Sequence, residues 1–157
     1  MKKLKLYLDT SIINFVIAED SLIEKQVTRQ LLREIEREKY EVFISEVVLL
    51  EINRAPEAIS QKLKSIVKDL DAEELSIDQE SQMLANRYIE EGIIPEKYEN
   101  DALHIAIASV NNLDVIVSWN FRHIVKLKTK REVTGVNAIM GYKEIEIYSP
   151  WEVVENV

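Results

Sequence analysis

Three acidic residues in this sequence lie at or inside apolar segments that a folded chain would bury. Asp9 follows the first apolar segment, Glu51 lies within a second, and Asp101 opens the most apolar segment of the chain. A buried carboxylate costs several kcal/mol unless it is paired or bound to a metal. If the three carboxylates converge, a cation neutralises them, and oxygen ligands without His or Cys select Mg²⁺ or Mn²⁺. Such an ion activates water and clamps a phosphate, so these residues predict metal-dependent phosphodiester hydrolysis.

Each acid also has a structural interpretation that the sequence leaves open. Asp9 suits the cap of the helix that follows it, with a hydrogen bond to Ser11. Glu51 suits an ion pair with Arg54, which lies one helical turn further on. Asp101 suits the first turn of a helix, where a carboxylate complements the helix dipole. Only convergence of the three acids at one place distinguishes the functional interpretation from these alternatives.

Three further polar residues lie next to apolar segments. Ser118 and Asn120 follow the apolar segment 114–117, where a hydroxyl and an amide either position a water or a phosphate or form an ordinary turn. His104 lies one turn after Asp101 within the same apolar segment, a position where a histidine is more often a hydrogen-bonded core residue than a ligand.

Strand and helix patterns alternate along the chain, which predicts a parallel sheet flanked by helices. The strands are expected at 5–8, 41–44, 74–77, 114–117 and 145–148, with Pro150 ending the last one. The helices are expected at 10–18, with Thr10 or Ser11 as its cap, and at 21–39, 46–52, 56–71, 78–91 and 101–110. Residues 95–100 are expected to form a loop, and the basic segment 121–136 is expected to be partly helical. In an open α/β sheet, ligands bind beyond the carboxyl ends of the strands, which is where Asp9 and Ser118 are expected.

Composition limits the class of protein. The 157 residues suit one domain spanning 1–157, and the absence of cysteine excludes disulfides and thiolate metal sites and fits a reducing compartment such as the cytoplasm. No segment resembles a signal peptide or is long and apolar enough to span a membrane, so no membrane partner is expected. The formal net charge of −8 argues against broad electrostatic capture of nucleic acid, although a bound cation supplies positive charge locally.

Four segments of this sequence resemble the PIN-domain family, and most closely the VapC-type toxins of toxin–antitoxin pairs. They are LYLDTSIIN at 6–14, ISEVVLLEI at 44–52, NDALHIAIAS at 100–109 and VIVSWNFRHI at 115–124. The four segments occur in the order of the family and span most of the chain. The resemblance implies a three-layer α/β/α sandwich with a central, mostly parallel sheet, and an endoribonuclease that depends on Mg²⁺ or Mn²⁺.

The resemblance also implies site residues and partners. Asp9, Glu51 and Asp101 match the three acids of the family, which bind the metal, and Ser118 and Asn120 match the hydroxyl and the fourth polar residue of its last motif. The implied partners are an RNA substrate, a cognate antitoxin protein and a second copy of the chain in a homodimer. The chain departs from the family at Asn120 and at His123, where the family often has aspartate.

A basic stretch after the last motif supplies charge that an RNA substrate would need, or forms a solvated surface. It comprises Arg122, Lys126, Lys128, Lys130 and Arg131. Two other functions stay open. The first is a PIN fold with a weakened site that acts as a protein-binding module. The second is a phosphatase with Asp9 as the nucleophile, although Ser11 occupies the place where such enzymes carry a second acid.

Overall fold

Five short strands form the centre of the molecule, and all of their pairings are parallel. The computed structural model describes residues 2–37 and 39–155. The strands are β1 (Leu4–Leu8), β2 (Tyr40–Ser45), β3 (Glu73–Leu75), β4 (Val115–Val117) and β5 (Glu146–Tyr148). They lie in the order β3-β2-β1-β4-β5, so the chain builds outward from β1 in one direction and then returns to build in the other.

The central strands are apolar because both faces of the sheet are covered. Leu6, Leu8 and Val115 pack into one hydrophobic cluster, whereas Tyr7 and Ile116 belong to the other. Successive side chains of a strand point to opposite faces, so each central strand contributes to both clusters. This explains why β1 and β4 appear in the sequence as short continuous apolar segments rather than as alternating ones.

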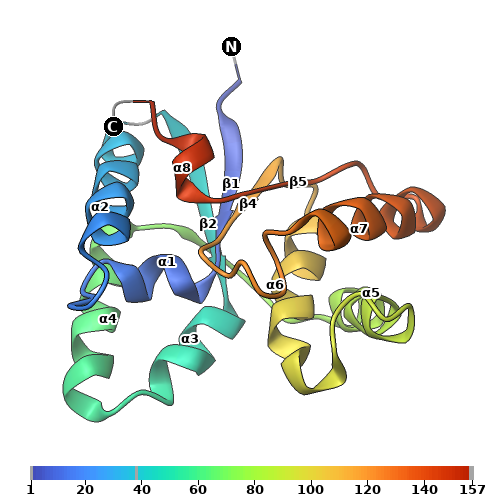
Figure 1. The fold of residues 1–157 in the computed structure, drawn as a ribbon, viewed down its shortest axis with the longest axis horizontal. Helices are drawn as coiled ribbons and strands as arrows, with labels where there is room; N and C mark the ends of the chain where they lie inside the picture. Colours follow the sequence, from blue (N-terminus) through green and yellow to red (C-terminus); the bar gives the residue numbers. More distant parts are fainter. Residues whose placement is uncertain (1, 38, 156–157) are drawn as a thin grey trace.

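Helices cover both faces of this sheet (Figure 1). On one side lie α1 (Thr10–Phe15), α2 (Leu22–Glu36), α3 (Glu46–Asn53), α4 (Glu57–Leu70) and α8 (Pro150–Val153). On the other side lie α5 (Gln79–Glu90), α6 (Glu99–Val110) and α7 (Leu127–Met140), with the short 3₁₀ helix η1 (Glu96–Tyr98) before α6. The predicted three-layer α/β/α sandwich is therefore confirmed, with a sheet that is parallel throughout.

Several element boundaries differ from the predicted ones. The segment 95–100 was expected to be a loop, but it contains η1 and the first two residues of α6. The prediction that 121–136 is partly helical is confirmed, since residues 121–126 form turns and bends and α7 begins at Leu127. Val133 and Val136 of this helix are buried against the core, and Gly141 ends it with a positive φ. Pro150 begins α8 rather than merely ending β5, since proline suits the first position of a helix.

The predicted single domain and the second predicted helix include residues that the structure does not describe. These are Met1, Glu38, Asn156 and Val157. Within the described ranges, no helix combines the length and the apolar composition that crossing a membrane requires.

Candidate active site

The candidate site lies where the direction of sheet building reverses. Leu8 at the end of β1 pairs with Val117 at the end of β4, so Asp9 and Ser118 leave the sheet side by side. The chain runs from β1 to β2 on one side of this point and places β4 on the other. A reversal of this kind leaves a crevice beyond the carboxyl ends of the strands, which is the usual ligand position in open α/β sheets.

Asp9 is buried at this edge and is held by two serine hydroxyls. Its side chain is 3% exposed; the Ser11 hydroxyl donates to Oδ1 at 2.5 Å and the Ser118 hydroxyl donates to Oδ2 at 2.6 Å. Asp9 occupies the cap position of α1, so the prediction that Thr10 or Ser11 caps this helix is wrong, although the Asp9 side chain makes no capping hydrogen bond. Its carboxylate is therefore directed toward the crevice residues rather than to the backbone of its own helix.

A cavity of about 430 Å³ brings the three predicted acids together. Asp9, Glu51 and Asp101 all line it, although they come from the end of β1, from α3 and from α6. The remaining lining residues are Thr10, Ser11, Asn14, Arg54, Ala55, Leu63, His104 and Asn120. The convergence that separates the functional from the structural interpretation of the acids is thus present.

The Glu51 carboxylate is bonded to residues from two other helices. His104 Nε2 lies 2.8 Å and the Thr10 hydroxyl lies 2.7 Å from the same atom, Glu51 Oε1. Its partners are therefore His104 and Thr10 rather than Arg54, which was the structural alternative. The Glu51 side chain keeps 29% of its surface exposed, so the carboxyl group also faces the cavity.

Burial and charge perturb the pKa values of this cluster in opposite directions. Burial raises the pKa of Asp9, and the charge of Asp101 raises it further, against the charge of His104 and the two serine hydroxyls. Burial also raises the pKa of Glu51, but the hydrogen bond and the charge of His104, together with hydrogen bonds from Thr10 and Asn100, lower it overall. Burial lowers the pKa of His104, yet Glu51 and the neighbouring acids raise it overall. His104 is thus a hydrogen-bonded core residue, as predicted, and it lines the site as well.

Asp101 faces the cavity from the first turn of α6. Burial raises its pKa, His104 and the Asn120 side chain lower it, and the charge of Glu51 raises it. The charge of Glu51 raises the pKa of Asp101, and the charge of Asp101 raises the pKa of Asp9, so the acids of the cavity repel one another. A bound cation would remove this repulsion.

Ser118 and Asn120 combine both of the interpretations that the sequence left open. Asn120 Oδ1 accepts from the backbone N–H groups of Arg122 and His123 at 3.1 and 2.9 Å, as in an ordinary turn. The Asn120 side chain nevertheless lines the cavity and contacts Asp101. The Ser118 hydroxyl supports Asp9, and Ser118 Oγ also accepts from the Asn120 N–H at 2.9 Å, so this turn and the acid hold one another in place.

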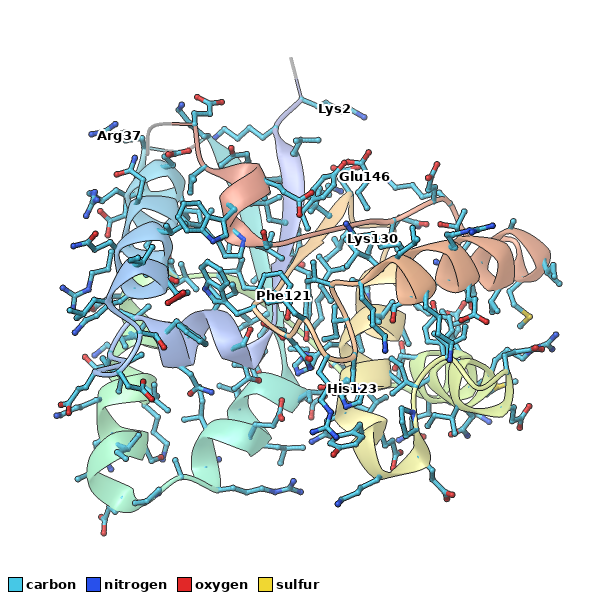
Figure 2. All side chains as sticks on the ribbon, in the orientation of Figure 1. Lys2, Arg37, Phe121, His123, Lys130 and Glu146 are labelled. Atoms are coloured by element: carbon cyan, nitrogen blue, oxygen red, sulfur yellow. The ribbon has the colours of Figure 1, made fainter. Side chains whose placement is uncertain are left out.

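The predicted basic stretch is dispersed rather than gathered at the cavity. None of its five residues lines the cavity, and they lie in the segment between β4 and α7 and on α7 itself, where Figure 2 labels Lys130. Lys128 Nζ donates to the Gly92 carbonyl at 2.9 Å, and the Lys130 ammonium lies over the Tyr148 ring. These contacts suit a solvated helix face better than a continuous surface for RNA.

His123 does not replace the aspartate of the family as a further acid. It is buried against Tyr98, with ring centroids 4.1 Å apart, and its Nε2 atom has no hydrogen-bond partner within the described residues. Burial lowers its pKa, and so do Arg122 and Lys126. His123 is therefore neutral at pH 7 and packs against Tyr98, the residue before α6.

Sequence reasoning placed the acids but missed what surrounds them. The predicted hydrogen bond between Ser11 and Asp9 is confirmed, but Thr10 was considered only as a helix cap and Tyr7 was not considered at all. A positional signal was present, because Tyr7 lies two residues before Asp9 on the same side of β1 and His104 lies one turn after Asp101 on α6. Polar side chains two residues from an acid along a strand, or one turn from it along a helix, lie on the same side as the acid.

Comparison with known proteins supports a common ancestry for this site and its sheet. The model of the PIN domain matches residues 6–125, which include every predicted site residue from Asp9 to Asn120. Comparison of the sequence with functionally curated proteins yields no significant match.

Solved structures share the fold at low sequence identity. A VapBC2 complex from Rickettsia felis bound to a promoter DNA fragment has a chain with 16% identity and a TM-score of 0.59, over 93% of this chain and 98% of that one. A DNA-bound VapBC from Salmonella typhimurium has 17% identity and a TM-score of 0.53, over 94% and 98%. VapBC-5 from Mycobacterium tuberculosis has 18% identity and a TM-score of 0.51, over 92% and 98%. Because the family model spans β2, β3, β4, most of β1 and the three acids that line the crevice, this chain belongs to the PIN-domain family.

Proposed function

We propose that this protein is a metal-dependent endoribonuclease and the toxin of a toxin–antitoxin pair. The observation that carries the proposal is the convergence of Asp9, Glu51 and Asp101 on one cavity at the reversal point of the sheet. Membership of the PIN-domain family supports nuclease activity, since PIN domains are nucleases. The choice of RNA as the substrate belongs to the proposal.

The donor chemistry of the cavity fits Mg²⁺ or Mn²⁺. Within residues 2–37 and 39–155, no three acidic or histidine side chains are arranged as a ready-made metal site. Mg²⁺ does not require one, because proteins often bind it through one or two carboxylates while it keeps several waters. Asp9 and Asp101 would bind the ion directly, and Glu51 would ligate it or orient a water molecule. When bound, the ion supplies activation of water and stabilisation of charge on the scissile phosphate.

The protein groups have distinct tasks in this proposal. The Ser11 and Ser118 hydroxyls orient the Asp9 carboxylate, and the Asn120 side chain holds Asp101 or a phosphate oxygen. A second hollow of about 370 Å³ shares Glu51, Arg54 and Asp101 with the cavity and continues along residues 96–100, which gives an extended substrate a path to the acids. Arg54 is the cationic side chain common to both hollows, and its guanidinium suits a phosphate next to the cleaved one.

The assignment to a toxin–antitoxin pair is supported by structural neighbours that are VapBC complexes, with almost the whole of each neighbouring chain covered. The proposed partner is therefore a cognate antitoxin protein. Homodimerisation stays a prediction from the family resemblance.

The decisive experiment compares Asp9→Asn with Asp69→Asn on a mixed RNA substrate. Both variants remove one negative charge, but Asp69 lies exposed on α4 whereas Asp9 lines the cavity. We expect Asp9→Asn to lower Mg²⁺-dependent cleavage by about 10²–10³-fold, because a preorganised electrostatic group at a reacting centre contributes at that scale. Asp69→Asn should cleave like the wild type. Full activity of a folded Asp9→Asn protein would overturn the proposal.

One observation favours the alternative of a protein-binding module, namely that the described side chains contain no ready-made three-residue metal site. Calorimetry with Mn²⁺ separates the two functions. Binding that disappears in Asp9→Asn supports the nuclease. A wild-type protein that binds no Mn²⁺ at millimolar concentration would act through protein contacts alone.

A further inference from the structure

A chain of buried hydrogen bonds runs from the end of β2 to the acid on α3. The Ser45 and Tyr7 hydroxyl oxygens lie 2.7 Å apart, and the Tyr7 hydroxyl lies 2.6 Å from His104 Nδ1. The other ring nitrogen of His104 lies 2.8 Å from Glu51 Oε1. Ser45, Tyr7 and His104 are each at most 1% exposed, so the Ser45–Tyr7 and Tyr7–His104 contacts are shielded from bulk water, whereas Glu51 also faces the cavity.

The directions of the hydrogen bonds follow from the chemistry of the groups. An ionised carboxylate only accepts, so His104 Nε2 donates to Glu51. With a neutral ring, Nδ1 then accepts from the Tyr7 hydroxyl, Tyr7 accepts from Ser45, and Ser45 Oγ accepts from the Val47 N–H at 3.1 Å. With a charged ring, Nδ1 donates to the Tyr7 oxygen and the Tyr7 hydroxyl donates to Ser45. The same groups are linked in both states, which holds each of them at one position.

Each member of these hydrogen bonds lies on an element that carries or directly precedes one of the acids. Tyr7 lies on β1, which ends one residue before Asp9, and residues two positions apart in extended backbone point to the same side. Ser45 caps α3, the helix that contains Glu51. His104 lies one turn after Asp101 on α6. These hydrogen bonds therefore connect β1, α3 and α6, the three elements that bring the acids to the cavity.

We propose that Ser45, Tyr7 and His104 are positioning residues that fix the three acids relative to one another, with the Tyr7 hydroxyl as the central link. This inference rests on the proposed function, because it assigns the chain to the same site. A positioning role differs from a packing role in its consequence. Removing a positioning residue should change the geometry of the acids, whereas removing a packing residue should change stability alone.

A second buried tyrosine provides a matched control. Tyr88 is fully buried, and its hydroxyl lies 2.5 Å from Asn137 Oδ1 and 3.4 Å from Ser109 Oγ, away from the acids. Tyr7→Phe and Tyr88→Phe thus remove the same atom from the same kind of environment. If the hydroxyls serve stability only, the two variants should have the same consequences.

We expect the two variants to differ in Mn²⁺ binding and in turnover. Tyr7→Phe should weaken Mn²⁺ binding in calorimetry about tenfold and lower kcat about tenfold with KM for RNA unchanged, the scale at which partners of metal ligands act. Tyr88→Phe should leave both quantities at wild-type values. The positioning role is wrong if a folded Tyr7→Phe protein matches Tyr88→Phe in Mn²⁺ affinity and in kcat.

Substitutions of His104 test whether the residues act as one chain. His104→Gln keeps a side-chain donor for Glu51 and should retain more Mn²⁺ affinity than His104→Leu, which keeps none. The double variant Tyr7→Phe/His104→Leu should bind Mn²⁺ as His104→Leu does, because a chain that is already broken has no second link to lose. Additive losses would show that the two residues act separately and would overturn the proposal. If His104→Leu does not fold, the comparison of the two tyrosines decides alone.

The readouts separate failure of this inference from failure of the proposed function. A wild-type protein that binds Mn²⁺ but cleaves no RNA would refute the nuclease, while the Mn²⁺ titrations of the variants would still decide the positioning role. A wild-type protein that binds no Mn²⁺ at millimolar concentration would overturn both.

Discussion

Among the described residues, the polar network around Tyr88 and the one around Asp9 and Glu51 are both buried, but they differ in charge. One joins Tyr88, Asn137 and Ser109 between α5, α6 and α7, with Asn137 Nδ2 donating to Ser109 Oγ at 3.0 Å. The other surrounds Asp9 and Glu51 at the end of the sheet. Each contains a fully buried tyrosine. The first consists only of neutral groups that satisfy one another, whereas the second gathers three carboxyl groups around one histidine.

The neutral network is expected to stabilise the folded state, whereas the charged network is expected to destabilise it. Neutral groups that satisfy one another lose little on burial. In the cavity, burial raises the pKa of both Asp9 and Asp101, so the folded state disfavours their ionised forms. The Asp9 and Asp101 carboxylates therefore lower the stability of the folded protein, and such locally destabilising groups are expected at a functional site.

The largest expected effect on stability comes from the neutral network. Asn137→Ala leaves the Tyr88 hydroxyl and Ser109 without their partner in the core and creates a cavity. We expect the free energy of unfolding to fall by about 3 kcal/mol, with unchanged Mn²⁺ affinity. Urea denaturation and calorimetry measure the two quantities. A loss below about 0.5 kcal/mol would show that this network is not a stabilising element.

A smaller effect distinguishes the two serines. Ser118→Ala removes the donor to Asp9 Oδ2 and should cost about 2 kcal/mol at pH 7, since hydrogen bonds to charged groups are the stronger ones. Ser109→Ala removes a neutral partner and should cost about 1 kcal/mol. Urea denaturation at several pH values in EDTA tests this comparison.

The losses of stability in Ser118→Ala and Ser109→Ala should respond differently to pH. The Ser118 hydroxyl favours the ionised form of Asp9, so its contribution is present at pH 7 and shrinks as pH falls through the raised pKa of Asp9. The Ser109 contribution involves no titrating group and should stay constant. An equal pH response in both variants would contradict the assignment of charge to one network alone.

The smallest expected effect is a gain. Asp9→Asn replaces a desolvated carboxylate with a neutral group, and serine hydroxyls both donate and accept, so its neighbours can adapt. We expect about 1 kcal/mol of added stability at pH 7 in EDTA, together with the loss of activity described above. Because the folded pKa of Asp9 is raised, the penalty of its ionised form is complete at pH values above that pKa and disappears as pH falls to the ordinary carboxyl range. The added stability of Asp9→Asn should therefore decrease as the pH is lowered. An increase instead would show that the pKa of Asp9 is not raised in the folded protein.

Much of the fold follows from local patterns in the sequence. The short apolar segments that became β1, β2 and β4, and the caps Ser45 and Asp78, are determined by residues next to one another. A prediction failed at 95–100, which was expected to be a loop but contains η1 and the start of α6. The expectation of a partial helix within 121–136 is confirmed by α7, which packs Val133 and Val136 against the core.

The sequence by itself determined which residues bring negative charge to the site, because Asp9, Glu51 and Asp101 are conspicuous beside apolar segments. Only the tertiary structure decided what those charges meet. His104 joins Glu51 across 53 positions and Tyr7 across 97, and no local pattern encodes such pairs. They arise because parallel strands end at one edge and the helices after them converge there, which is a property of the assembled sheet rather than of any one segment.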